Sequence, residues 1–243
     1  MIKNKDLIAN FKDSTLIIVV TYRRKNIIQL SIENILNIIN KRKNTYMVII
    51  NNHSSEEVNT YVRSIDHPQC VNIQLPFNFG KALAANFFFK DYISHKNLPK
   101  TIISLDPDTV FSKESFEKLV SASINLPQCG MIGMRYTKNN CNPERNLFFK
   151  PKKIKSNSNN IYSLSCPFMC TVAGPIFAVE GKKILNECNN ELFPKKVIKV
   201  YGGDDSALYN KLRKKYINGY LEGTEATHMH SGNKTCIPKE LDQ

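Results

Sequence analysis

The 243-residue sequence contains no tryptophan and no long apolar run. Its densest aliphatic stretch, Leu16–Val20, spans five residues, whereas a membrane-spanning helix needs roughly 20. The N-terminal segment is basic, but it has neither a continuous apolar region nor a small-residue cleavage site, so we expect no signal peptide. These absences exclude an integral membrane protein and favour a cytoplasmic one.

Regularly spaced cysteines are also missing. The chain has seven cysteines, which are irregularly spaced and form no Cys-x-x-Cys pair. This pattern gives no support to a zinc ribbon or to a thioredoxin-type redox motif. We therefore expect free thiols, as in proteins of a reducing cytoplasm.

Acidic residues are scarce relative to basic ones. Lys and Arg total 34 against 21 Asp and Glu, which gives a net charge of +13. Such a surface attracts anions, including nucleic acid, anionic lipid head groups and phosphorylated substrates. The alternative is compositional, because an AT-rich genome supplies Lys and Asn wherever a surface tolerates them.

Short apolar strands alternate with helical patterns through the first half of the chain. Thr15–Tyr22 is rich in β-branched residues, as a strand buried on both faces is, and a helical apolar stripe follows it. We predict strands at 15–22, 46–50, 71–75 and 101–105, and helices at 25–43, 55–63, 81–93 and 113–124, the last capped by Ser112. This order predicts an α/β fold, Rossmann-like, with a mostly parallel sheet and helices on both faces.

The second half is less regular. We expect strands at 131–136 and 171–179, the latter interrupted by Gly174-Pro175, and a last strand ending near His228–His230. We also expect an exposed loop at 150–160, a loop at 186–200, and a helix from Gly202-Gly203 to Tyr216. No internal repeat and no true linker divide the chain. We therefore expect a single domain in two lobes.

Polar residues follow each strand of the first half. In an open parallel sheet, ligands bind beyond the carboxyl ends of the strands, so these residues should meet at one edge. The four clusters are Thr21-Tyr22, Asn51-Asn52, Asn78–Gly80 and Asp106–Asp108.

Asp106-Pro-Asp108 is the most informative of these clusters. Residues i and i+2 of an extended segment point the same way, and Pro107 restricts Asp106 to extended conformations. Both carboxylates can therefore face one site, which suits a hard divalent cation that also binds phosphate oxygens. The alternative is a polar turn after a strand.

Two further pairs carry chemistry in the second half. Asp204 and Asp205 open a helix, where one can serve as an N-cap and the other as a general base. His228 and His230 would share a face of a strand, and near a carboxylate-bound cation one imidazole could complete the coordination. Without such a cation, a structural role is the simpler interpretation of the histidines.

Together these residues give the chain a resemblance to family 2 glycosyltransferases of the GT-A type, from about residue 15 to about residue 232. No single motif decides it, but seven follow the family's order and approximate spacing. The matching segments are Val19–Arg23, Ile49–Ser54, Asn78–Asn86, Asp106–Asp108, Ala173–Phe177, Asp204-Asp205, and His228 or His230.

The resemblance implies a nucleotide-sugar half at 15–130 and an acceptor half at 131–243. In the first, Thr21, Tyr22 and Asn52 would hold the nucleobase, and Asn78 and Lys81 would lie near the base, ribose or diphosphate. The other positions implied to bind the donor are Arg23, Gly80, Asp106 and Gly174.

The resemblance also implies a metal and a base. Asp108 would ligate Mn²⁺ or Mg²⁺ with help from Asp106 and from His228 or His230. Asp205, with Asp204 beside it, would deprotonate the acceptor. The implied reaction is inverting: the acceptor attacks the anomeric carbon from behind while the nucleoside diphosphate leaves.

The chain departs from the family pattern in two informative places. Asn51-Asn52 replaces the usual acidic pair, which leaves the nucleotide open, although an Asn can still accept a hydrogen bond from a pyrimidine N–H. Without tryptophan the chain lacks the Gln-x-x-Arg-Trp motif of processive relatives. We therefore expect transfer of one sugar, with a UDP-sugar as the first choice of donor.

The basic surface suggests the acceptor. Lysines cluster at 150–155 and at 195–199, both in the acceptor half, where they could steer a glycan, a lipid-linked acceptor or another anionic acceptor. They could equally be solvated loops. Peripheral contact with the inner face of the membrane is a further expectation. One alternative function is a nucleotidyltransferase, although the chain has no Gly-rich phosphate loop near its N-terminus. The other is a basic nucleic-acid-binding protein, although no binding module is recognisable.

Overall fold

The computed structural model describes residues 2–40, 42–137, 149–168, 170–172, 175–194, 203–231, 234–235 and 237. The strands are β1 (Ile2–Lys3), β2 (Thr15–Thr21), β3 (Thr45–Asn51), β4 (Cys70–Gln74), β5 (Thr101–Leu105), β6 (Thr109–Phe111), β7 (Cys129–Tyr136), β8 (Phe149–Lys155), β9 (Ile161–Pro167), β10 (Ile176–Glu180), β11 (Ile217–His228), β12 (His230–Ser231) and β13 (Lys234–Thr235). The helices are the 3₁₀ helix η1 (Lys5–Phe11) and the α-helices α1 (Lys25–Ile39), α2 (Glu56–Ser64), α3 (Gly80–Tyr92), α4 (Lys113–Asn125), α5 (Gly181–Glu187) and α6 (Asp204–Leu212).

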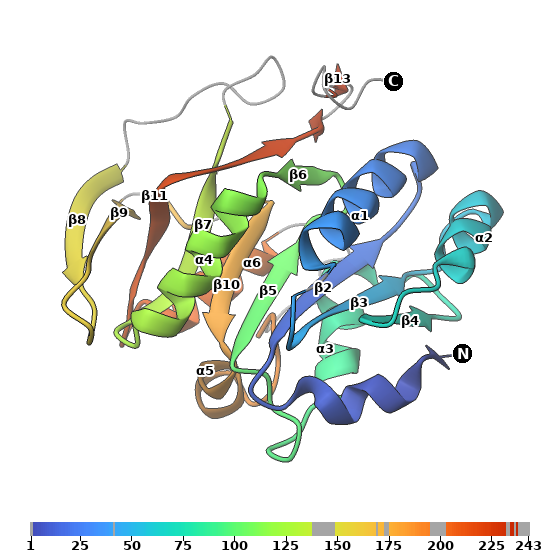
Figure 1. Cartoon of the computed structure of the whole chain (residues 1–243), viewed down its shortest axis with the longest axis horizontal. Helices are drawn as coiled ribbons and strands as arrows, with labels where there is room; N and C mark the ends of the chain where they lie inside the picture. The colour runs from blue at the N-terminus through green and yellow to red at the C-terminus, as the bar shows by residue number, and fades with distance from the viewer. Residues whose placement is uncertain are drawn as a thin grey trace.

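One large twisted sheet organises the molecule (Figure 1). Its strand order is β1-β4-β3-β2-β5-β10-β7-β11-β9-β8, and β6 adds to β11. The central strands β4, β3, β2, β5, β7 and β11 run in the same direction, while β10 lies antiparallel between β5 and β7. The expected mostly parallel α/β sheet is therefore confirmed.

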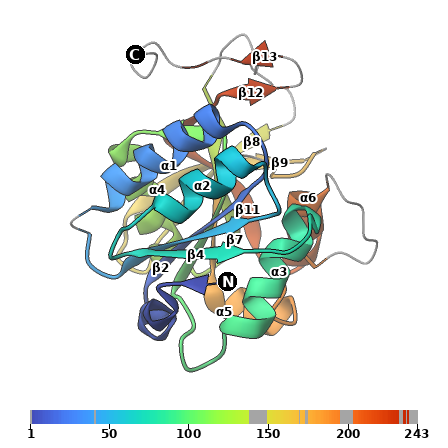
Figure 2. The same ribbon diagram turned by 90° about the vertical axis from the view of Figure 1, so that its right-hand side faces the viewer.

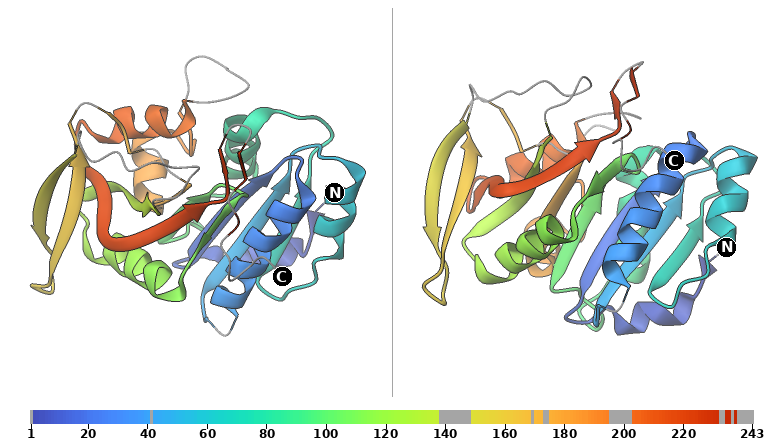
Figure 3. Two further views of the ribbon diagram at one scale, coloured as in Figure 1. Left: turned by 90° about the horizontal axis from the view of Figure 1, so that it is seen from above. Right: turned by 45° about the horizontal axis from the view of Figure 1, so that its top comes forward.

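Helices cover both faces of this sheet, as Figure 3 shows from above. Alternate residues of each strand point to opposite faces. On β2, Ile17 and Val19 pack with α1, α2 and α4, whereas Leu16 and Ile18 pack with η1, α3, α5 and α6. The two cores explain why the buried strands read as unbroken apolar runs.

Two local expectations are confirmed. Ser112 caps α4, since its side chain accepts a hydrogen bond from the backbone N–H of Ser115. The described cysteines, Cys70, Cys129, Cys166, Cys170 and Cys188, are free thiols. None of the described helices has the length and apolar character needed to cross a membrane.

Other expectations for the second half are wrong. The predicted loop at 150–160 is mostly strand, because β8 pairs with β9 and keeps its lysines exposed at the edge of the sheet, where Lys and Pro are tolerated. The strand predicted at 171–179 begins only at Ile176, and the helix predicted to reach Tyr216 ends at Leu212. The lysine cluster at 195–199 lies outside the described residues.

Candidate active site

The polar clusters that follow the first parallel strands do meet at the carboxyl edge. The backbone N–H of Asn52 donates to the Thr21 carbonyl at 3.0 Å. The Asn52 side chain donates to Asn78 Oδ1 at 2.7 Å and accepts from the Phe79 N–H at 2.9 Å. These contacts tie the ends of β2 and β3 to the loop before α3.

A group of potential metal ligands forms where β5 ends. One ligand atom each from Asp106, Asp108 and His228 lies within 4.8 Å of the others. His228 arrives through tertiary structure, because β6, directly after Asp108, pairs antiparallel with the end of β11. The Met229 N–H donates to the Asp108 carbonyl at 2.8 Å, and His228 Nε2 lies 3.0 Å from Asp108 Oδ1.

Lys81 joins this group to the acidic pair of α6. Its Nζ lies 2.6 Å from Asp106 Oδ1 and 3.7 Å from Asp205 Oδ1. Burial acts to lower the pKa of Lys81, but the carboxylates of Asp106 and Asp205 outweigh it and raise that pKa above its usual value. Burial raises the pKa of Asp106, against the lowering effect of Lys81. A cationic amine therefore stands between two carboxylates that are 99 residues apart in the sequence (205 minus 106).

The acidic pair itself occupies the first turn of α6. The N-cap residue is Gly203, which has φ of 76° and no side chain that could cap the helix. Asp204 and Asp205 both lie inside the helix, so neither is the N-cap that the sequence allowed. Carboxylates in a first turn interact favourably with the helix dipole. Asp204 is buried and Asp205 is directed to Lys81.

Comparison with known proteins identifies the family. The family model for glycosyl transferase family 2 matches residues 16–177, more than half of the chain. The chain belongs to glycosyltransferase family 2. The Asp-x-Asp triplet lies within the matched range. No protein with a curated description matches the sequence.

Solved structures share the GT-A fold at low sequence identity. The mannosyltransferase PcManGT of Pyrobaculum calidifontis, solved with GDP-Man and Mn²⁺, has a TM-score of 0.65 and 17% identity over 95% of this chain and 59% of its own. S. aureus TarS residues 1–349 with UDP-GlcNAc gives 0.66 and 14%, over 90% and 60%. GalNAc-T7 with UDP, GalNAc and Mn²⁺ gives 0.60 and 11%, over 90% and 44%. The chain thus spans about 60% or less of these proteins' lengths.

The residues predicted to hold the nucleobase differ in exposure. Thr21 and Asn52 are buried, and both polar ends of the Asn52 amide already bond to the loop before α3. Tyr22 is 38% exposed, and the Arg23 guanidinium lies 4.8 Å from the centre of its ring. Contact of these residues with a base stays a prediction.

Three further residues predicted to bind the donor or the metal have different surroundings. Gly80 has φ of 74°, a left-handed conformation that favours glycine, and its N–H donates to Asn78 Oδ1. His230 is not part of the ligand group around Asp108, and its Nδ1 lies 3.3 Å from Thr235 Oγ1. Gly174 lies outside the described residues.

Two aromatic residues that sequence reasoning missed border the site. Tyr136, at the end of β7, has its ring centre 5.8 Å from that of His228. Burial, with Asp106 and Asp205 nearby, raises the pKa of Tyr136. Phe193 lies under the amine of Lys81, 5.3 Å from ring centre to nitrogen. Tyr136 ends a predicted strand, a position that could have marked it, whereas the sequence gives no signal for Phe193.

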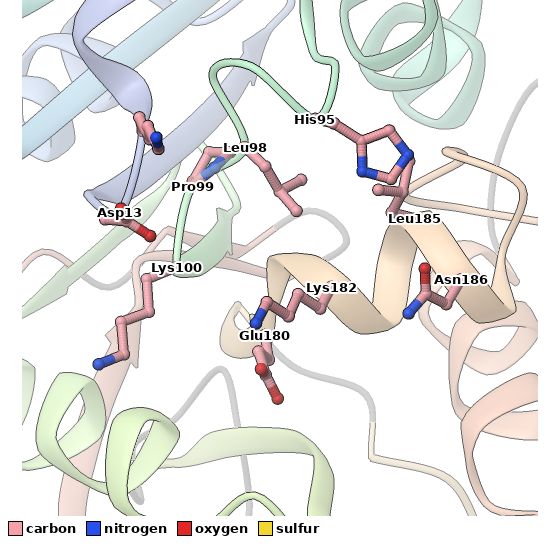
Figure 4. A pocket seen from close by; sticks show the side chains of 10 residues that line it. Asp13, His95, Leu98, Pro99, Lys100, Glu180, Lys182, Leu185 and Asn186 are labelled. Carbon is pink, nitrogen blue, oxygen red and sulfur yellow. The ribbon is translucent and has the colours of Figure 1, made fainter.

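A separate hollow of about 650 Å³ lies at the opposite edge of the sheet (Figure 4). Asp13 and Lys100, which line it, precede β2 and β5, whereas the ligand group follows β5. Figure 4 shows Lys100 extending away from Lys182 and Glu180. The charged side chains that line this hollow therefore do not converge on one point, unlike those around Lys81. The carboxyl edge is therefore the candidate active site.

Proposed function

We propose that this protein is a metal-dependent, inverting glycosyltransferase that moves one sugar from a nucleoside-diphosphate donor to an acceptor hydroxyl. The observation that carries the proposal is the shared contact of Lys81 with Asp106 and Asp205. It joins the group suited to a cation and diphosphate to the group suited to a base. A UDP-sugar is the preferred donor, and a glycan, lipid-linked or other anionic molecule is the preferred acceptor.

The residues around Asp108 fit a divalent cation. Two carboxylates supply hard oxygen ligands and one imidazole supplies nitrogen, a set compatible with Mn²⁺ and, with less preference, Mg²⁺. PcManGT and GalNAc-T7 were both solved with Mn²⁺. When bound, the cation supplies positive charge that offsets charge developing on the diphosphate leaving group.

The chain's own groups would then do three things. Asp205 would accept the proton of the acceptor hydroxyl as its oxygen attacks the anomeric carbon from the face opposite the leaving group. Lys81, held cationic by its two carboxylates, would lie beside the diphosphate as negative charge grows there. Tyr136 would border the space between His228 and the donor sugar. We assign residues 15–130 to the donor and 131–243 to the acceptor.

A ligand-stabilisation screen tests the proposal. The protein is heated with a panel of UDP-, GDP-, CDP- and dTDP-sugars, with Mn²⁺ or with EDTA. A ligand that binds only the folded form raises the melting temperature, by an amount set by its affinity. We expect one nucleotide class to do so with Mn²⁺ and to lose the effect with EDTA, and that donor then enters a transfer assay. Stabilisation by no nucleotide sugar, or by all of them regardless of EDTA, would contradict the proposal.

A further inference from the structure

The end of β7 is fastened to the end of β11 at the candidate active site, and Figure 2 shows the two strands side by side. Tyr136 pairs with Ala226 in the parallel register of these strands. The Thr137 N–H donates to the Ala226 carbonyl at 2.9 Å, and the Thr227 hydroxyl donates to that of Thr137 at 3.2 Å. These contacts fix the position of Tyr136 relative to His228, which follows Ala226 by two residues.

The ring of Tyr136 packs against the imidazole of His228. The two ring centres are 5.8 Å apart and their planes are inclined by 58°, which is within the range of separations at which aromatic rings attract one another. His228 Nε2 lies 3.0 Å from Asp108 Oδ1. The imidazole therefore contacts a ring as well as a carboxylate, and the ring restricts its rotation away from Asp108.

The hydroxyl of Tyr136 is a hydrogen-bond donor without a partner in the described part of the chain. Burial raises the pKa of Tyr136, and the charges of Asp106 and Asp205 raise that pKa further. The hydroxyl therefore stays protonated at neutral pH and can donate. It forms no hydrogen bond with a described residue, and 38% of the Tyr136 surface is exposed, so a substrate can reach it.

Two groups of the proposed site define where the transferred sugar would lie. The cation group around Asp108 would face the departing diphosphate, and Asp205 would accept the proton of the attacking hydroxyl. In an inverting displacement the anomeric carbon lies between the attacking and the leaving oxygen. Tyr136 contacts His228, a member of the cation group, and lies close enough to Asp205 for that charge to act on its hydroxyl. Its side chain therefore borders the place that the transferred sugar would occupy.

We propose that Tyr136 is a sugar-binding residue, whose hydroxyl donates a hydrogen bond to a hydroxyl of the transferred sugar while its ring holds His228 toward Asp108. The inference rests on the proposed function and adds a residue that selects the sugar. A site built to hydrogen-bond a substrate hydroxyl discriminates against a substrate that lacks it. Tyr136 would therefore favour donors whose sugar carries a hydroxyl at the position that it meets.

Tyr136→Phe tests the hydrogen bond, because it removes the hydroxyl and keeps the ring. Calorimetry with Mn²⁺ compares UDP and GDP with UDP-glucose, UDP-GlcNAc and GDP-mannose. We expect the variant to bind the nucleoside diphosphate as tightly as the wild type, and to bind its sugar-bearing form about tenfold more weakly, as loss of one hydrogen bond predicts. Tyr92→Phe is the matched control: it removes a hydroxyl at the end of α3 that likewise forms no hydrogen bond with a described residue, and it should change neither affinity.

Tyr136→Leu tests the ring. Calorimetry with Mn²⁺ alone measures the affinity of the site for the cation, independently of turnover. We expect the affinity to fall about fivefold in Tyr136→Leu, since the imidazole loses its packing partner, and to stay within about twofold of wild type in Tyr136→Phe. If Tyr136→Leu lowers the melting temperature, the measurements on Tyr136→Phe carry the test.

Three results would overturn the assignment of Tyr136. One is equal weakening of the nucleoside diphosphate and its sugar-bearing form in Tyr136→Phe, and another is no weakening of either. The third is wild-type affinity for Mn²⁺ in a folded Tyr136→Leu. Each of these leaves the proposed function standing, whereas a wild type that binds none of the nucleotides with Mn²⁺ would contradict the proposed function itself.

Discussion

The two halves of the molecule contribute to one site in different ways. In residues 15–130, β2, β3, β4 and β5 lie side by side and parallel, and their polar residues follow the strand ends directly. In residues 131–243, β10 enters antiparallel, β11 pairs with β7 and at its end also with β6, and α6 delivers Asp205. The first half places its groups by local sequence order, and the second half places them by contacts across the sheet.

This difference suggests a division of labour. We expect groups of the first half to govern binding of metal and donor, and groups of the second half to govern transfer. His228 is the informative exception, because it belongs to the second half by sequence and to the ligand group by structure. The following experiments separate the two halves, from the largest expected effect to the smallest.

Asp108→Asn should impair the metal and donor binding that we assign to the first half. Without this carboxylate, the cation and diphosphate lose a charged ligand, so turnover should fall by about 1,000-fold or more, equivalent to about 4 kcal/mol of transition-state stabilisation. Nucleotide-sugar binding measured by calorimetry should lose its dependence on Mn²⁺. Wild-type turnover in this variant would remove Asp108 from the metal site.

Asp205→Asn should impair only the sugar transfer that we assign to the second half. Loss of a general base typically costs about 100-fold to 10,000-fold in rate, while donor affinity should change by less than about threefold because the amide keeps the shape of the side chain. Single-turnover assays and calorimetry on the same preparation measure the two quantities. Collapse of donor binding would instead make Asp205 a donor ligand.

Asn218→Ala tests the long-range ties that hold the second half together. The Asn218 side chain is buried and accepts a hydrogen bond from the Met131 N–H across the β7–β11 pair. Leaving that N–H unpaired should lower the free energy of unfolding by about 2 kcal/mol. Urea denaturation measures the change, and a difference within error would show that water replaces the bond.

His228→Gln tests whether this residue of the second half contributes to metal binding. Loss of the imidazole should raise the Mn²⁺ concentration needed for half-maximal activity by about tenfold, since the two carboxylates remain. His230→Gln is the matched control and should change it by less than about twofold. The reverse order of effects would make His230 the ligand.

Ser112→Ala should have the smallest effect. This residue caps α4 through a local bond to the Ser115 N–H, so its loss should cost about 1 kcal/mol of stability without changing metal or donor binding. Urea denaturation beside a donor titration checks both parts. A larger loss than in Asn218→Ala would contradict the contrast between local and long-range placement.

The features that could be predicted from the sequence are those that depend on local patterns. The apolar run at β2, the capping serine of α4 and the two carboxylates around Pro107 each depend on neighbours within a few residues. The pairing of β8 with β9 could not be anticipated, because a lysine-rich segment reads as a loop until a partner strand supplies its hydrogen bonds. Nor could Phe193 beneath Lys81, since ring and amine lie on segments 112 residues apart (193 minus 81).

The sequence by itself determined the alternation of strands and helices, the chemistry at each strand end and the resemblance to a transferase family. It did so because strand and helix periodicity and turn preference act over short stretches of chain. Only the tertiary structure decided that His228 joins Asp108 and that Lys81 lies between Asp106 and Asp205. Those outcomes depend on which strands pair and which faces pack, and such long-range contacts form only when the whole sheet closes around its two cores.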